Sequence, residues 1–265
     1  MEDSTDKGRF HDVVWLDYSK QLTARDVRRY VQLAGVLEPL SEKPGCTTRT
    51  KDLPGQKLEY FVTAAVNIGD VFEDLANRLH HGFPQTTYDL AYRAQADSKK
   101  NRRGGRTNQG IIEFLFPLVI TQCVNQSPTL HALFDYLPDI MQQTTSEDTF
   151  WLQQMQNLAF AMSGYYHRAF SIMPAANIPT YYTHRLVQAE KPSDLYHNRE
   201  MVENYPTLQK MFTMQVGGPL SERMAILYSA IKNGQSGMPC GMIADLVACY
   251  IYLEFSYNRQ GKIIS

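Results

Sequence analysis

Residues 111–124 read IIEFLFPLVITQCV, and Glu113 is the one charged residue among them. The remainder is mostly Ile, Leu, Phe and Val. An apolar segment of this length without a polar face predicts a helix that is buried on all sides. We expect this helix to begin near Asn108, so the residues just before it should lie at the end of a buried helix.

The segments on both sides show helical periodicity nearly everywhere. Thr23, followed three residues later by Asp26, is a helix-start signal. Further helices are expected at 58–79, 87–98, after Ser127-Pro128, and at 146–172, 220–231 and 239–257. No segment combines period-two alternation with hairpin turn residues, so no sheet is needed. We predict an all-α, single-domain bundle of about ten helices.

The expected domain spans residues 23–258, between a polar N-terminal extension (1–22) and a C-terminal tail (259–265). The formal net charge of the 265 residues is -1, which argues against a general nucleic-acid binder. No apolar stretch follows the polar N-terminus, so neither a signal peptide nor a membrane anchor is expected. Four cysteines without CxxC spacing favour reduced thiols in a cytoplasmic protein over a zinc site or a disulfide framework.

A basic, glycine-rich loop precedes the apolar helix. Residues 99–110 read KKNRRGGRTNQG. The first N–H groups of a helix and its positive dipole end capture phosphate, and Arg side chains add bidentate contacts to phosphate oxygens. The loop therefore predicts a site for a small polyanion. The alternative is a solvated surface loop, which is the commoner meaning of a charge run.

Two other segments carry polar side chains suited to a binding site. Residues 42–55 offer cations, hydroxyls and glycines between the first two long helices, with Asp52 as a candidate metal or hydroxyl ligand. Asp52 has structural alternatives, because it can cap the next helix or pair with Lys51. Residues 173–206 are interrupted by prolines and rich in aromatic and ionisable groups, and an irregular connection of that length is usually functional or disordered. Arg199 and Glu203 also have the spacing of a surface ion pair.

Two of these loops resemble motifs of the triphosphoribosyl-dephospho-CoA synthase family. Lys43-Pro44-Gly45, with Arg49, Asp52 and the helix YFVTAA at 60–65, is similar to the family's opening (K/R)PG motif. Residues 106–111, RTNQGI, resemble its N-T-(H/N)-x-G-I motif. Residues 198–206 resemble a later motif with a one-residue shift. The chain has KNGQSG at 232–237 where the family shows an Asp-Thr-Asn motif and a Gly-Gly turn.

The resemblance, which spans about residues 26–255, implies an enzyme that uses ATP as a triphosphoribosyl donor. A hydroxyl of an acceptor such as dephospho-CoA attacks the anomeric carbon of ATP, adenine departs, and the triphosphate stays on the transferred ribose. This chemistry needs cations and Mg²⁺ on the triphosphate and a base near the attacking hydroxyl. The resemblance thus implies Mg²⁺ bound with ATP as substrate, and small-molecule partners. Homodimer formation is left open.

Candidate residues for each role follow from the loops and the resemblance. The candidates for nucleotide or phosphate binding are Lys43, Arg49, Arg102, Arg103, Arg106, Thr107, Asn108 and Arg199. The candidates for catalysis are Asp52, Glu200 and Glu203, and those for metal binding are Asp52 and Glu203. We expect the three loops to line one mouth of the bundle, because alternate connections of an antiparallel bundle emerge at the same end.

Other functions remain open on the sequence. One alternative is a non-catalytic nucleotide- or CoA-binding helical protein, and another is a nucleotide-dependent biosynthetic enzyme with a different acceptor. An interaction protein that contacts RNA is disfavoured, because aromatic side chains are not interleaved with the basic cluster.

Overall fold

The computed structural model describes residues 22–82, 86–125, 129–162, 204–214, 216–235 and 237–257. Over these ranges the protein has nine helices and no strand, which confirms the all-α fold and comes close to the expected number of helices. The helices are α1 (Ala24–Leu37), α2 (Leu58–His80), α3 (Tyr88–Asp97), α4 (Gln109–Asn125), α5 (Leu130–Gln142), α6 (Ser146–Met162), α10 (Tyr205–Thr213), α11 (Leu220–Gly234) and α12 (Cys240–Tyr257). Residues 1–21 of the expected N-terminal extension, the C-terminal tail, and the end of the helix expected at 146–172 lie outside the described residues, whereas Leu22, the last residue of that extension, is buried in the core.

Helix α4 lies at the centre of the bundle, as its sequence predicts. Every residue from Ile111 to Cys123 is buried, and α4 contacts α1, α2, α3, α5 and α12. Phe116 packs between Phe72 of α2 and Tyr88 of α3, with ring centroids 5.0 and 5.6 Å apart. Pro117 removes one backbone donor from the middle of this helix, a change that disfavours an isolated helix by about 3 kcal/mol. Burial on all sides outweighs that penalty.

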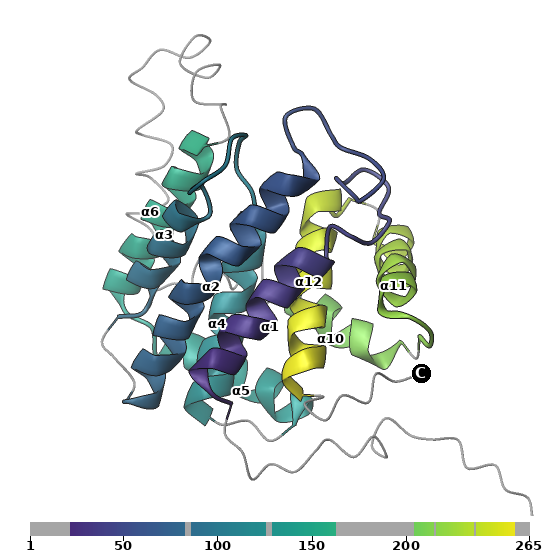
Figure 1. The fold of residues 1–265 in the computed structure, drawn as a ribbon. Helices are drawn as coiled ribbons and strands as arrows, with labels where there is room; N and C mark the ends of the chain where they lie inside the picture. Colours follow the sequence, from purple (N-terminus) through teal and green to yellow (C-terminus); the bar gives the residue numbers. More distant parts are fainter. Residues whose placement is uncertain are drawn as a thin grey trace, which may run out of the picture.

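The other helices surround α4 in the arrangement of Figure 1. Helices α1 and α2 pack side by side, α3 and α6 pair next to α2, and α12 packs against α1 and α4 with α11 beside it. Core residues from all the described helices form one continuous hydrophobic cluster. The α1–α2 loop, the α3–α4 loop and the first turn of α12 lie at the same end of the bundle, the upper end in Figure 1.

Two helix starts have caps that fix their position. Thr23 and Asp26 form the expected capping box at the start of α1, with the Asp26 N–H donating to Thr23 Oγ1 at 3.1 Å. The start of α3 is capped from another helix, because the Asp148 carboxylate of α6 accepts from the N–H groups of Thr87 (2.7 Å) and Tyr88 (3.1 Å). A carboxylate at a helix N-terminus is stabilised by the free N–H groups and by the dipole.

Among the described residues, α12 is the one helix that is both long enough and apolar enough to cross a membrane. However, 72% of it is buried inside the bundle. Burial of this kind is usual for the core helix of a globular protein. Two polar contacts hold α12 in place: Arg223 of α11 pairs with Glu254 at 2.7 Å, and the Tyr252 hydroxyl donates to Gln122 of α4 at 2.8 Å. Buried charged and polar groups of this kind need such partners.

Candidate functional site

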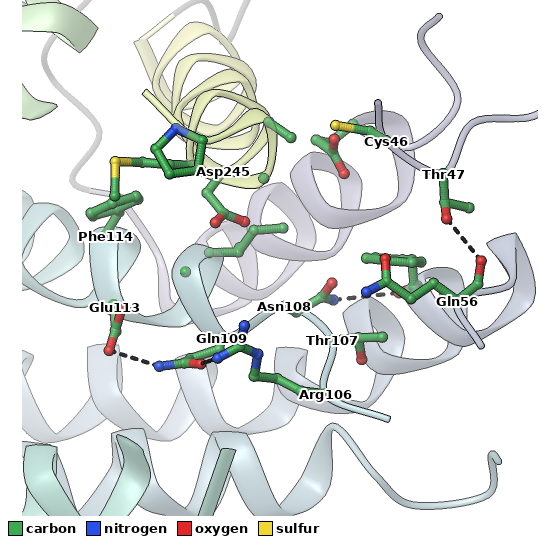
Figure 2. A pocket seen from close by; sticks show the side chains of 18 of the residues that line it. Cys46, Thr47, Gln56, Arg106, Thr107, Asn108, Gln109, Glu113, Phe114 and Asp245 are labelled. Carbon is green, nitrogen blue, oxygen red and sulfur yellow. Dashed lines mark hydrogen bonds between the residues drawn. The ribbon is translucent and has the colours of Figure 1, made fainter. Parts of the chain in front are cut away.

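A cavity of about 580 Å³ opens where the α1–α2 loop, the start of α4 and the start of α12 meet (Figure 2). Its volume is in the range of small-molecule sites. Both motif loops identified in the sequence contribute to its wall. The lining residues are Glu38, Gly45, Cys46, Thr47, Leu53, Gln56, Phe61, Arg106, Thr107, Asn108, Gln109, Gly110, Ile111, Glu113, Phe114, Pro239, Gly241, Met242, Ala244 and Asp245.

Asp245, in the second turn of α12, is a partly buried acid of this cavity. Its side chain lies in the cavity wall, close to Gly110 at the start of α4. Burial raises the pKa of Asp245 well above its ordinary range, and the nearby carboxylates of Glu38 and Glu113 raise it further. The Arg106 guanidinium and the Ile111 N–H lower the pKa by less. Such a carboxyl favours its protonated form and is suited to proton transfer.

The start of α4 is built to meet this carboxyl. Asn108 has a left-handed backbone (φ 57°), and its carbonyl accepts the first helical bond, from the Ile112 N–H at 2.9 Å. Gly110 lies two residues after Asn108, and a Cβ at that position would overlap the carboxyl oxygen Oδ2 of Asp245. The glycine therefore allows α12 to approach α4, and the helix end predicted for phosphate faces Asp245 as well as the cavity (Figure 2).

Arg106 belongs to a row of hydrogen-bonded side chains along one wall. Its Nη1 donates to Gln109 Oε1 at 2.8 Å, and Gln109 Nε2 donates to Glu113 Oε1 at 3.1 Å (Figure 2). Gln156 of α6 donates to the same Glu113 oxygen at 2.8 Å. The row orients Arg106, which is otherwise exposed, beside the cavity.

Thr107 and Asn108 are buried at the cavity wall and have unused hydrogen-bonding atoms. Asn108 Nδ2 donates to the Phe61 carbonyl at 3.4 Å, while Asn108 Oδ1 and Thr107 Oγ1 have no hydrogen-bond partner among the residues that the structure describes. A buried polar atom without a partner costs about 1–3 kcal/mol. A ligand with hydroxyl or other polar groups would relieve that penalty. Their predicted role in ligand binding stays a prediction, and their position is consistent with it.

Four predicted phosphate ligands do not line the cavity. The buried ammonium of Lys43 pairs with Glu38 at 3.0 Å and donates to the Glu38 and Ser41 carbonyls, so it holds the α1–α2 loop together. Arg49 is exposed and pairs with Glu42 at 3.5 Å. The Arg102 guanidinium donates to carbonyls of its own loop, and Arg103 is exposed. Their role in phosphate binding stays a prediction, for which these contacts offer no support.

Asp52 takes the structural role that was its alternative in the sequence. Its side chain is exposed and Oδ1 accepts from the Leu58 N–H at 2.8 Å, so it caps the start of α2. Asp52 does not line the cavity, although its neighbour Leu53 does. Arg199, Glu200 and Glu203 lie outside the described residues. The two described motif loops therefore share one cavity. Arg106 lines it, whereas Asp52 does not.

Sequence reasoning missed Asp245, Glu38 and Gln56 as cavity residues. The sequence did contain a signal for Asp245, because it is an acidic residue near the start of a largely apolar helix. Acidic residues rarely lie in the buried parts of a protein without a partner or a function. Within the described part of the chain, no group of three or more His, Cys, Asp or Glu side chains is arranged to hold a metal ion.

Comparison with known proteins identifies one family. The model of the family described as CitG, ATP:dephospho-CoA triphosphoribosyl transferase, matches residues 24–215. The match includes both motif loops of the cavity and ends before α11 and α12, so Asp245 lies outside it. No curated protein and no solved structure matches the chain significantly.

Replacing Gly110 by Ala should lower the free energy of unfolding by about 1–3 kcal/mol, the usual effect of overpacking, because the added methyl group overlaps the Asp245 carboxyl. Gly241→Ala is the matched control: it lies in the first turn of α12, lines the same cavity and has open space around it. Urea denaturation should show that Gly241→Ala is neutral or stabilising. Equal effects at the two positions would contradict the close contact.

The raised pKa of Asp245 also predicts how stability depends on pH. In the unfolded chain the Asp pKa is roughly 3.9, so above that pH the folded protein holds a proton that the unfolded chain releases. This contribution to the free energy of unfolding is complete below the unfolded pKa and is lost as the pH rises through the folded pKa. Asp245→Asn replaces this carboxyl with an amide, which does not titrate. Its free energy of unfolding, minus that of the wild type, should therefore increase with pH and then level off.

Chemical denaturation of both proteins over a series of pH values measures this difference. A difference that stays constant with pH would mean that Asp245 ionises normally in the folded protein.

Proposed function

The chain belongs to the ATP:dephospho-CoA triphosphoribosyl transferase family, and we propose that its cavity transfers the triphosphoribosyl group of ATP to a hydroxyl of dephospho-CoA or a similar acceptor. Members of this family are transferases, so the chain is an enzyme of that class. One observation carries the proposal. The two loops that resemble the family's motifs, far apart in the sequence, line the same cavity as Asp245, an acid with a raised pKa.

The charges of the cavity suggest how ATP would lie in it. The Glu38 and Glu113 carboxylates line the cavity and would repel a triphosphate, whereas Arg106 is an exposed cation in the cavity wall. We place the triphosphate, with its Mg²⁺, beside Arg106 and the ribose toward Asp245. The unpartnered oxygens of Thr107 and Asn108 then lie where ribose hydroxyls or phosphate oxygens would meet them.

We propose Asp245, rather than Asp52, as the group that transfers a proton during the reaction. When the bond from the anomeric carbon to adenine breaks, adenine keeps the bonding electrons and needs a proton. A carboxyl whose raised pKa favours the protonated form can donate it, and the resulting carboxylate can accept the proton of the attacking hydroxyl. Asp52 is exposed and engaged in capping α2. Glu200 and Glu203 remain candidates for a base and a metal ligand.

Other parts of the proposal rest on the sequence. The proposed cytoplasmic location rests on four cysteines without CxxC spacing. The expected partners are ATP and a small-molecule acceptor. Homodimer formation and the absence of nucleic-acid binding stay predictions.

The proposed function predicts that the purified protein, incubated with ATP, Mg²⁺ and dephospho-CoA, releases free adenine and produces an acceptor heavier by one triphosphoribosyl group. Chromatography with mass spectrometry measures both products. Formation of ADP instead would indicate phosphoryl transfer. ATP binding without either product would indicate the non-catalytic alternative.

Two variants separate the candidate acids in the same assay. Asp245→Asn should lower the rate of adenine release by about 10²–10⁴-fold, the usual contribution of a general acid or base, while ATP binding persists. Asp52→Asn keeps an oxygen that can cap α2 and should have the smaller effect. The opposite ranking would assign proton transfer to Asp52.

Arg106→Ala should weaken ATP binding by about 1–3 kcal/mol, because it removes a charge-assisted contact to the triphosphate. Binding should strengthen with Mg²⁺ and weaken with added salt, as expected for an accessible cationic site. Arg93→Ala, exposed on α3 and paired with Asp74, is the control. Isothermal titration calorimetry measures all three proteins. Unchanged affinity in Arg106→Ala, with a normal fold, would remove Arg106 from the site.

A further inference from the structure

We propose that Cys240 and Cys46 are an oxidation-sensitive thiol pair at the edge of the cavity, which a peroxide converts to a disulfide. The two residues are 194 positions apart in the sequence, yet the Cys46 thiol donates to the Cys240 carbonyl at 3.5 Å. Both are free thiols with partly accessible side chains. The pair is separate from the acid and the basic residues assigned to transfer, and the inference does not depend on that function.

A cluster of side chains from α11 brings the two cysteines together. The Tyr228 hydroxyl donates to the Pro44 carbonyl at 2.7 Å and lies 3.7 Å from the Cys46 sulfur. Lys232 donates to the same carbonyl at 3.2 Å. Gly45 has a left-handed backbone (φ 92°), and a Cβ there would lie 2.9 Å from the Cys240 sulfur. The Cys240 side chain is thus packed against the residue that precedes Cys46.

The surroundings make the two thiols different in reactivity. Cys240 begins α12, and the nearby Tyr228 hydroxyl lowers its pKa, with burial opposing this shift and the Lys232 ammonium adding smaller effects. Burial raises the pKa of Cys46 to about 11, with Glu38 and Cys240 adding to the shift and Tyr228 and Lys43 opposing it. Burial also raises the pKa of Tyr228, so its hydroxyl stays a donor. Cys240 is therefore the attacking thiolate and Cys46 the second thiol.

The reaction with hydrogen peroxide has two balanced steps. The Cys240 thiolate attacks one peroxide oxygen, a sulfur–oxygen bond forms, the oxygen–oxygen bond breaks, and the departing hydroxide takes a proton to become water. The Cys46 sulfur then attacks the sulfenic acid on Cys240 and loses its proton, and the released hydroxide becomes a second water. Two thiols are oxidised by two electrons in all, and one peroxide is reduced to two waters.

The disulfide would join the α1–α2 loop to the first turn of α12. Cys46 and Thr47 of that loop line the cavity, and Asp245 lies one turn further along α12. Oxidation would therefore fix the distance between two walls of the cavity. A change in ATP affinity on oxidation would link this pair to the proposed function, but formation of the disulfide does not require it.

The test uses the full chain, reduced and then treated with hydrogen peroxide, blocked with an alkylating reagent and digested without reduction for mass spectrometry. We expect a peptide pair joined through Cys46 and Cys240. Cys46→Ser should instead accumulate sulfenic acid on Cys240, trapped by dimedone, and Cys240→Ser should form no bridge from Cys46. The buried Cys123 and Cys249 should stay reduced.

A rate measurement tests the activation of Cys240. The rate at which iodoacetamide alkylates Cys240 is measured in the Cys46→Ser background, at a pH below the ordinary pKa of a thiol. Lys232→Met should slow this reaction several-fold. Lys210→Met should not, because Lys210 is an exposed residue of α10. Peroxide treatment that leaves Cys46 and Cys240 unlinked, or that links other cysteines, would overturn the inference. A Cys46–Cys240 disulfide in a protein that releases no adenine would leave it standing and count against the proposed function alone.

Discussion

Burial of α4 along its whole apolar length determines where the candidate site lies. Because Ile111 to Cys123 are covered by five other helices, the N-terminus of α4 has one position available, at the end of the bundle where the α1–α2 loop and α12 also meet. Gly110 completes the arrangement, since it lets the Asp245 carboxyl reach the first turn of α4. The core thus positions the cavity, and the motif residues next to α4 are held by the same packing.

The residues that line the cavity include three acids, Glu38, Glu113 and Asp245, and one basic residue, Arg106. Glu38 is compensated by Lys43, and Glu113 accepts hydrogen bonds from Gln109 and Gln156, whereas its surroundings raise the pKa of Asp245. Such a difference in surroundings is the usual basis for proton transfer by carboxyl groups, and it is why we propose that role for Asp245. In the proposed function, the polyphosphate would lie beside Arg106, away from the carboxylates of Glu38 and Glu113.

Much of the fold was predictable from the sequence, and the site only in part. The long apolar segment predicted α4, and Thr23 with Asp26 predicted the start of α1, because these signals are local. The two motif loops were also recognisable. The hydrogen-bond partners of individual charged residues were not predictable, since Lys43 and Arg102 donate to nearby carbonyls that the sequence does not reveal. Asp245 was missed because the acids that raise its pKa, Glu38 and Glu113, come from distant segments that only the fold brings together.

A crystal structure of the protein with ATP and Mg²⁺ tests the central claim most directly. We expect the nucleotide between the α1–α2 loop and the start of α4, with the triphosphate at Arg106 and the anomeric carbon toward Asp245. Nucleotide bound elsewhere on the protein, with this cavity empty, would contradict the assignment of the cavity as the transferase site.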